Sequence, residues 1–109
     1  RRSAILCRRN ASLAGVAAEV IEAPDEDALA NLHEFDLVLL DPPRTGARAA
    51  CEVLAARGPE RIVYVSCDAA TFARDARALT SGGYSLGALE AFDMFPQTPH
   101  VEILGTFER

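Results

Sequence analysis

The stretch "RIVYVSCDAATFARDARALTSGG", residues 61–83, decides the fold of this chain. It opens with "RIVYVS", a short run rich in apolar and β-branched residues, which is typical of a strand covered on both faces. It continues with "AATFARDARALTSGG", which predicts a helix that stops at the glycine pair. A buried strand followed directly by a helix is the repeating unit of a parallel α/β sheet.

The same unit occurs once more upstream, and the chain ends differently. "FDLVLLDPPR", residues 35–44, predicts a second buried strand, which Pro42-Pro43 must stop because proline cannot donate to the sheet ladder. The segment "ARAACEVLAARG", residues 47–58, predicts a helix that ends at its last glycine. The tail "YSLGALEAFDMF", the loop "PQTP" and the final "HVEILGTFER" predict two strands of an antiparallel hairpin. The remaining expected elements are a helix over Ala4–Leu13 ending at Gly15, a strand over Ala18–Ile21, and a short helix from an N-cap at Asp25 through Leu32.

This order of elements predicts one α/β domain built like part of a Rossmann-like sheet, with mostly parallel strands and a closing antiparallel hairpin. Folds of this kind usually begin with a strand and a glycine-rich turn. Here the sequence opens on a helix and contains no GxGxxG motif. We therefore expect residues 1–109 to be the later part of a catalytic domain that lacks its N-terminal glycine-rich cofactor turn.

Composition narrows the class of protein. No apolar run approaches the length of a membrane span. The three cysteines form no CxxC or His-paired spacing, so we expect neither disulfides nor a metal site, and a cytoplasmic location. Cys7 and Cys51 fall in helical patterns and are expected in the core. The net charge of −5 makes the chain a poor nonspecific binder of phosphate backbones, so any grip on nucleic acid must come mainly from regions absent here.

Chemically capable side chains follow the ends of the buried strands. Asp41 and Cys67 come directly after two strands, and Glu102 follows the "PQTPH" loop where the last strand starts. Ligands of open parallel sheets bind beyond the carboxyl ends of the strands. Singly, each has a simpler explanation: Cys67 as a small core residue, Asp41 as a turn former, and Glu102 and Arg44 as surface residues. Their joint position at one edge favours a functional site.

Three segments, "DPPRTG", "IVYVSCDAATFARD" and "DMFPQTPHVE", occur in an order and spacing that resemble the RNA uracil-5 methyltransferases. The resemblance covers roughly residues 8–109. It implies an enzyme that uses S-adenosyl-L-methionine to make 5-methyluridine in tRNA or 23S rRNA. It also implies a class I methyltransferase fold. The 109 residues alone are expected to be inactive, because half of the cofactor site would lie upstream.

The resemblance also implies the roles of the edge residues. Cys67 would be the nucleophile that adds to uracil C6, and Glu102 the base that removes the C5 proton. Asp41 matches the acid that lines the cofactor site, and Arg44 would help to ionise the thiol. The target base would flip out of its stack to reach this pocket.

The sequence departs from the family pattern beside the nucleophile and before the second helix. Asp68-Ala69 replaces the usual Asn-Pro, and a carboxylate there opposes thiol ionisation unless it points away. Pro24, followed by Asp25, fills a position that is often a polar cofactor contact. Two alternatives remain: another class I methyltransferase, cytosine-5 or N-directed, and a truncated noncatalytic interaction module.

Overall fold

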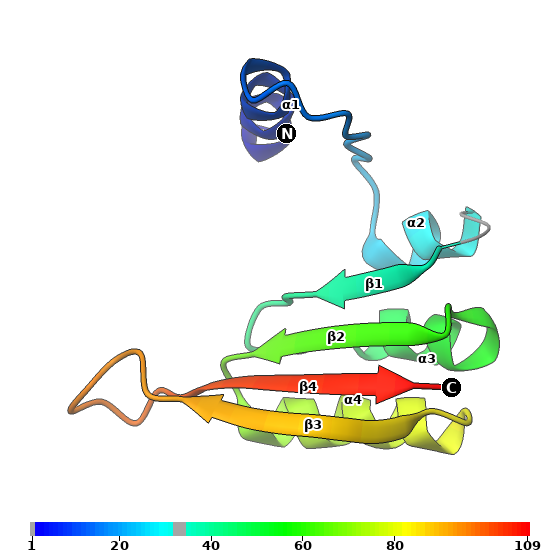
Figure 1. Cartoon of the computed structure of the whole chain (residues 1–109), viewed down its shortest axis with the longest axis vertical. Helices are drawn as coiled ribbons and strands as arrows, with labels where there is room; N and C mark the ends of the chain where they lie inside the picture. The colour runs from blue at the N-terminus through cyan, green and yellow to red at the C-terminus, as the bar shows by residue number, and fades with distance from the viewer. Residues whose placement is uncertain (1, 32–34) are drawn as a thin grey trace.

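The computed structural model describes residues 2–31 and 35–109. Helices and strands alternate along most of the chain, and a β-hairpin closes it (Figure 1). The elements are α1 (Arg2–Leu13), α2 (Asp25–Asn31), β1 (Leu37–Leu40), α3 (Arg48–Arg57), β2 (Arg61–Ser66), α4 (Ala69–Ser81), β3 (Ser85–Phe92) and β4 (Glu102–Glu108).

The four strands form one mixed sheet in the order β1-β2-β4-β3. β1 and β2 are parallel, whereas β4 runs antiparallel to both β2 and β3. The α/β class and the closing antiparallel hairpin are therefore confirmed, although the described sheet has one parallel and two antiparallel pairings. The predicted strand over Ala18–Ile21 is wrong. This segment is irregular and largely exposed, and it runs from α2 toward α1 without a strand beside it to complete its backbone hydrogen bonds (Figure 1).

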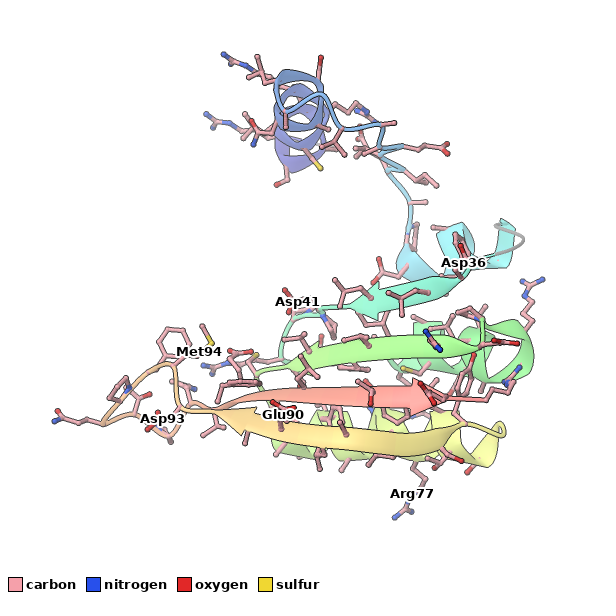
Figure 2. The ribbon with its side chains drawn as sticks, viewed as in Figure 1. Asp36, Asp41, Arg77, Glu90, Asp93 and Met94 are labelled. Carbon is pink, nitrogen blue, oxygen red and sulfur yellow. The ribbon has the colours of Figure 1, made fainter. Side chains whose placement is uncertain are left out.

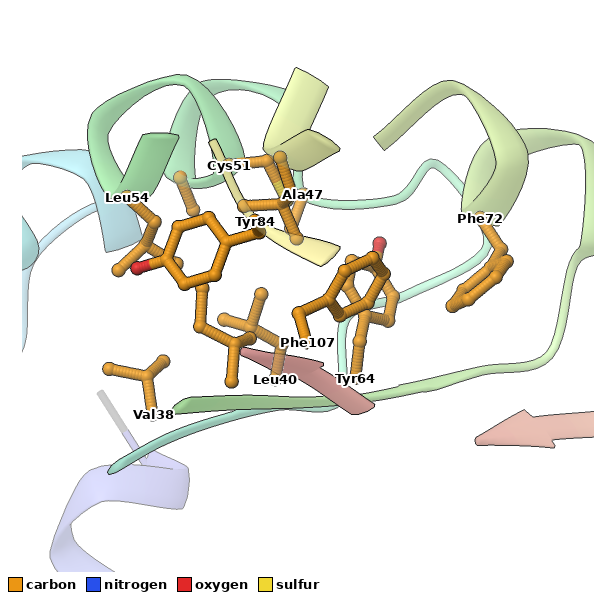
Figure 3. Close-up of a cluster of buried hydrophobic side chains, with 12 residues drawn as sticks. Val38, Leu40, Ala47, Cys51, Leu54, Tyr64, Phe72, Tyr84 and Phe107 are labelled. Carbon is orange, nitrogen blue, oxygen red and sulfur yellow. The ribbon is translucent and has the colours of Figure 1, made fainter. Parts of the chain in front are cut away.

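The hydrophobic core lies on one face of this sheet, beneath α3 and α4 (Figure 3). Buried residues alternate along the strands, so the paired residues Val38 and Ile62, and then Leu40 and Tyr64, all face the helices. The opposite face is open, and Leu39 there is 66% exposed. Side chains on the open face are consequently available to build a site at the edge of the sheet.

The loop after β1, residues 41–47, is fastened to the core by the buried carboxylate of Asp75 in α4. One Asp75 oxygen accepts hydrogen bonds from the Tyr64 hydroxyl at 2.6 Å and the Ala47 amide at 2.7 Å, and the other accepts from Arg74 Nε at 2.9 Å. Burial, followed by the hydrogen bond to Asp75, raises the pKa of Tyr64 above its ordinary value. Gly46 has a φ of +76°, and a Cβ there would lie 2.5 Å from Asp75 Oδ2, so the loop needs glycine at this point.

The helix ends agree with the predicted positions in α1, α3 and α4, but α1 begins at Arg2 rather than Ala4, and the start of α2 also differs. That helix has Asp25 as its first residue rather than as its N-cap, and the carbonyl of Pro24 accepts a backbone hydrogen bond from its first turn. The predicted end at Leu32 lies outside the described residues. Within the described ranges, no helix is long and apolar enough to cross a membrane. The predicted terminal glycines are all found where α1, α3 and α4 end: Gly15, Gly58 and Gly82.

Candidate active site

Cys67 stands on a sharp turn between β2 and α4. The Ser66 hydroxyl closes the turn, because it donates to the Asp68 carbonyl at 2.9 Å and accepts from the Asp68 amide at 3.1 Å. Cys67 itself is partly buried and precedes the N-cap of α4 by one residue. Cys67 therefore lies just before the N-terminus of a helix.

Asp68 caps α4 and turns its carboxylate toward the helix. Its Oδ1 accepts hydrogen bonds from the Thr71 amide at 2.9 Å and from the Thr71 hydroxyl at 3.1 Å. The backbone bond first, and then the side-chain bond, lowers the pKa of the Asp68 carboxyl. An asparagine side chain can accept the same two bonds. The replacement of the family's Asn by Asp at this position therefore preserves the cap.

Two neighbouring pockets contain the residues that the sequence placed at this edge. One pocket, of about 480 Å³, is lined by both Asp41 and Glu102. The other, of about 390 Å³, is lined by Cys67 and Arg44. We call this second pocket the Cys67 cleft. The two share one wall residue, Ile103, so the four predicted side chains line one continuous edge.

Strand register brings the cysteine and the glutamate toward each other. The pairing of β2 with β4 ends at Ser66 and Ile103. One further step in the same register would set Cys67 opposite Glu102. Residues opposite each other in an antiparallel pair have Cα atoms about 4.5–5.5 Å apart and share a face. The same extension of the β1–β2 register gives Asp41 the open face of the sheet.

The larger pocket combines carboxylates with an apolar wall. Among the described residues its lining includes two carboxylates and no basic side chain. Figure 2 shows Asp41 and Met94 at the same end of the sheet, and Asp36 at the opposite end. Pockets of this size with a few convergent polar groups are typical of small-ligand sites. Besides Asp41 and Glu102, the lining residues are Val65, Phe92, Met94, Phe95, Ile103 and Leu104.

Sequence reasoning missed two residues at this edge. His100 lies in the Cys67 cleft, where both of its ring nitrogens are within 3.2 Å of Arg44 Nη2. The sequence signal that could have indicated His100 as a site residue is its position two residues before Glu102, directly after a proline-containing loop. Asp75, which holds the 41–47 loop, occupies a position on the apolar face of α4 three residues after Phe72, where an acid is unusual.

The other two cysteines differ from Cys67 and from each other. Cys51 is fully buried, as predicted, and burial raises the pKa of its thiol to about 12. The prediction of a core position for Cys7 is wrong, because Cys7 is exposed on α1, a helix with no buried residue. Across the described ranges, no group of three or more His, Cys, Asp or Glu side chains is arranged to hold a metal ion.

The α/β sheet and the carboxylates and cysteine at its edge fit the class that the motifs indicated, and comparison with known proteins identifies the family. The profile of the tRNA (uracil-5-)-methyltransferase family matches residues 25–108. The chain belongs to this family.

Individual relatives give the same picture. A 23S rRNA (uracil(1939)-C(5))-methyltransferase RlmD of Alkalilimnicola ehrlichii is 57% identical over 69% of this chain and 17% of its own length. The RlmD of Aromatoleum aromaticum is 49% identical over all of this chain and 26% of its own length. A solved structure, the tRNA (uracil-54, C5)-methyltransferase of Pyrococcus abyssi in complex with S-adenosyl-L-homocysteine, is 40% identical with a TM-score of 0.80, covering 93% of this chain and 24% of that one. The chain thus spans about a quarter or less of the length of these relatives.

Proposed function

We propose that this chain is part of the catalytic domain of an enzyme that transfers a methyl group from S-adenosyl-L-methionine to C5 of a uridine in RNA. The observation that supports the proposal is the strand register, whose last pair, Ser66 and Ile103, lies one residue before Cys67 and one residue after Glu102. Names of the relatives point to tRNA or 23S rRNA as the substrate, and the higher identities are with rRNA enzymes.

The residues of the larger pocket fit one side of the cofactor. A sulfonium centre is positively charged, and the two carboxylates of Asp41 and Glu102 with an apolar wall complement such a group. Asp41 would be the cofactor contact. We propose that residues 1–109 supply only this part of the cofactor site and that the glycine-rich turn comes from another region of the protein. Other regions of the protein would supply most of the contacts with RNA. The enzyme would act in the cytoplasm.

In the proposed mechanism the thiolate of Cys67 adds to C6 of the uracil. The new S–C6 bond moves the electrons of the C5–C6 double bond into an enolate, so that C5 becomes nucleophilic. Bound S-adenosyl-L-methionine supplies an electrophilic methyl group. C5 takes the methyl group, and Glu102 then accepts the proton that remains on C5. The electrons of that C–H bond restore the double bond, and Cys67 leaves as the thiolate.

The test uses the full-length enzyme and RNA that contains 5-fluorouridine. Fluorine at C5 cannot leave as a proton, so a protein that forms the C6 adduct is trapped covalently and migrates more slowly on a denaturing gel. We expect wild type to be trapped and Cys67→Ala not to be trapped. Nucleoside analysis of ordinary RNA should show 5-methyluridine. Detection of 5-methylcytidine or an N-methylated base instead, or turnover retained by Cys67→Ala, would contradict the proposal.

A further inference from the structure

Two loops from opposite sides of β2 meet at the Cys67 cleft. The 41–47 loop follows β1, and residues 93–101 connect β3 to β4. Because β2 lies between β1 and β4, these loops flank the end of the strand that leads to Cys67. They are joined by Arg44 Nη2, which lies 3.0 Å from His100 Nδ1 and 3.2 Å from Nε2. The contact between Arg44 and His100 therefore links the two loops across the cleft.

Among the described residues, Arg44 forms no ion pair. The ion pairs found among the described residues involve other arginines, and none includes Arg44. Asp68, the carboxylate of this cleft, feels the charge of Arg44 but is hydrogen-bonded to Thr71. The contact of Arg44 with His100 is to an uncharged partner type rather than to a carboxylate, and Thr71 Oγ1 lies 3.0 Å from the Arg44 carbonyl oxygen. The guanidinium is therefore oriented while most of its donors remain available for a ligand.

The position beside the nucleophile indicates the chemistry of that ligand. In a nucleotide of the usual anti conformation, C6 is the part of the uracil ring that faces the 5′-oxygen of its own sugar. A thiol that attacks C6 therefore works next to the 5′-phosphate of the target nucleotide. Guanidinium groups bind phosphate oxygens strongly, often in bidentate geometry.

We propose that Arg44 binds the phosphate on the 5′ side of the target uridine, and that His100 is a positioning residue that orients Arg44 for this contact. The proposal rests on the proposed function, because it takes RNA as the ligand of the Cys67 cleft. It assigns the anchoring of the target nucleotide to a side chain of the 41–47 loop. Regions elsewhere in the protein are left to supply the remaining affinity for RNA.

The first experiment measures the salt dependence of RNA binding by the full-length enzyme. The logarithm of the RNA-binding constant falls as the logarithm of the salt concentration rises, and loss of one phosphate contact makes this slope shallower by about 0.7–0.9. We expect this decrease for Arg44→Gln and little change for Arg44→Lys. Arg77→Gln is the matched control, since it removes the same charge from the outer side of α4, away from the cleft (Figure 2). An unchanged slope in Arg44→Gln would overturn the proposal.

A second experiment removes the charge from the RNA instead. A methylphosphonate placed 5′ of the target uridine should weaken binding by wild type but have little further effect on Arg44→Gln. The same substitution one nucleotide farther along should weaken both proteins equally. Independent, additive effects at the proposed phosphate would overturn the assignment. Binding is measured without turnover. A wild-type enzyme that makes no 5-methyluridine would therefore refute the proposed function, while the effect of the methylphosphonate on binding could still be interpreted.

The role of His100 is tested by the kind of defect that its loss produces. His100→Ala should raise KM for RNA several-fold and leave kcat at saturating RNA nearly unchanged, since Arg44 is still present but less well oriented. His100→Gln keeps an acceptor for the guanidinium and should restore KM. A fall in kcat without a change in KM, or a failure of glutamine to rescue while the protein remains folded, would contradict a positioning role.

Discussion

The two ends of the sheet use their charged residues in opposite ways. At the end where β4 finishes, Arg109 donates to the carbonyls of Ala55 and Gly82 at 2.6 and 3.0 Å. Its guanidinium also lies 4.3 Å from the centre of the Tyr84 ring. At the end where β2 finishes, Asp41, Cys67 and Glu102 instead line two pockets. One end of the same four strands is closed by internal contacts, and at the other end the groups line open pockets.

This difference teaches that residue type alone does not indicate function in this chain. Glu102 and Glu108 begin and end the same strand and share a face, yet Glu108 lies 3.7 Å from Arg61 in an exposed ion pair. Cys51 and Cys67 differ in the same way, one in the core and one on a strand-to-helix turn. These matched pairs allow the contrast to be tested by substitution.

The largest expected effect is on the two cysteines. Cys67→Ala should lower kcat of the full-length enzyme by more than about 10³-fold, because it removes the proposed nucleophile. Cys51→Ala should keep turnover and cost about 1–2 kcal/mol of unfolding free energy through the cavity it leaves. Since the pKa of Cys51 is about 12, its thiol should also resist alkylation at pH 8, which mass spectrometry of the native protein would report. Equal losses of turnover in both variants would remove the contrast.

The next effect separates the two glutamates of β4. Glu102→Gln should slow turnover by about 10²–10⁴-fold, because it removes the proposed base for the C5 proton. The methylated covalent adduct should then accumulate on ordinary RNA and appear as a shifted band on a denaturing gel. Glu108→Gln, at the other end of the strand, should leave both measurements near wild type. If Glu102→Gln turned over normally, the base would have to be another group.

A smaller effect is expected at the closed end of the sheet. Arg109→Ala removes two hydrogen bonds to carbonyls and the contact with the Tyr84 ring, which together are worth about 1–2 kcal/mol at a partly exposed position. Chemical denaturation should show this loss, and methyl transfer per folded enzyme should stay unchanged. A loss of turnover without a loss of stability would show that the two ends are not independent.

The smallest effect concerns the cap of α4 and its dependence on pH. The pKa of Asp68 is lower in the folded protein than its ordinary value, so its contribution to stability is full above that value and is lost as pH falls through the folded pKa. The stability difference between wild type and Asp68→Ala should therefore be constant from pH 7 to about pH 5 and shrink in stronger acid. Asp68→Asn, which retains an acceptor for Thr71, should stay near wild type at neutral pH. Denaturant titrations across this range measure the difference, and one that grew in acid would contradict the cap.

Most local elements and the residues at the edge of the site could be predicted from the sequence. Contacts between segments that are distant in the sequence could not. Prolines after Leu40 and glycines after the helices predicted most of the boundaries, because these residues restrict the backbone locally. Ala18–Ile21 failed because a strand also needs a neighbour, which local pattern cannot supply. The contact between Arg44 and His100 spans 56 residues, and only the paired strands bring those loops together.

The buried Asp75 has a consequence for how the site moves. The amide of Ala47 donates to a carboxylate that is 0% exposed, so exchange of its proton with solvent requires the 41–47 loop to separate from α4. Hydrogen exchange at Ala47 should consequently be about as slow as at the centre of β2. The wall of the Cys67 cleft that carries Arg44 would then be the more firmly held of the two. We expect adjustment to an incoming nucleotide to occur mainly in the opposite wall, on the β3–β4 connection.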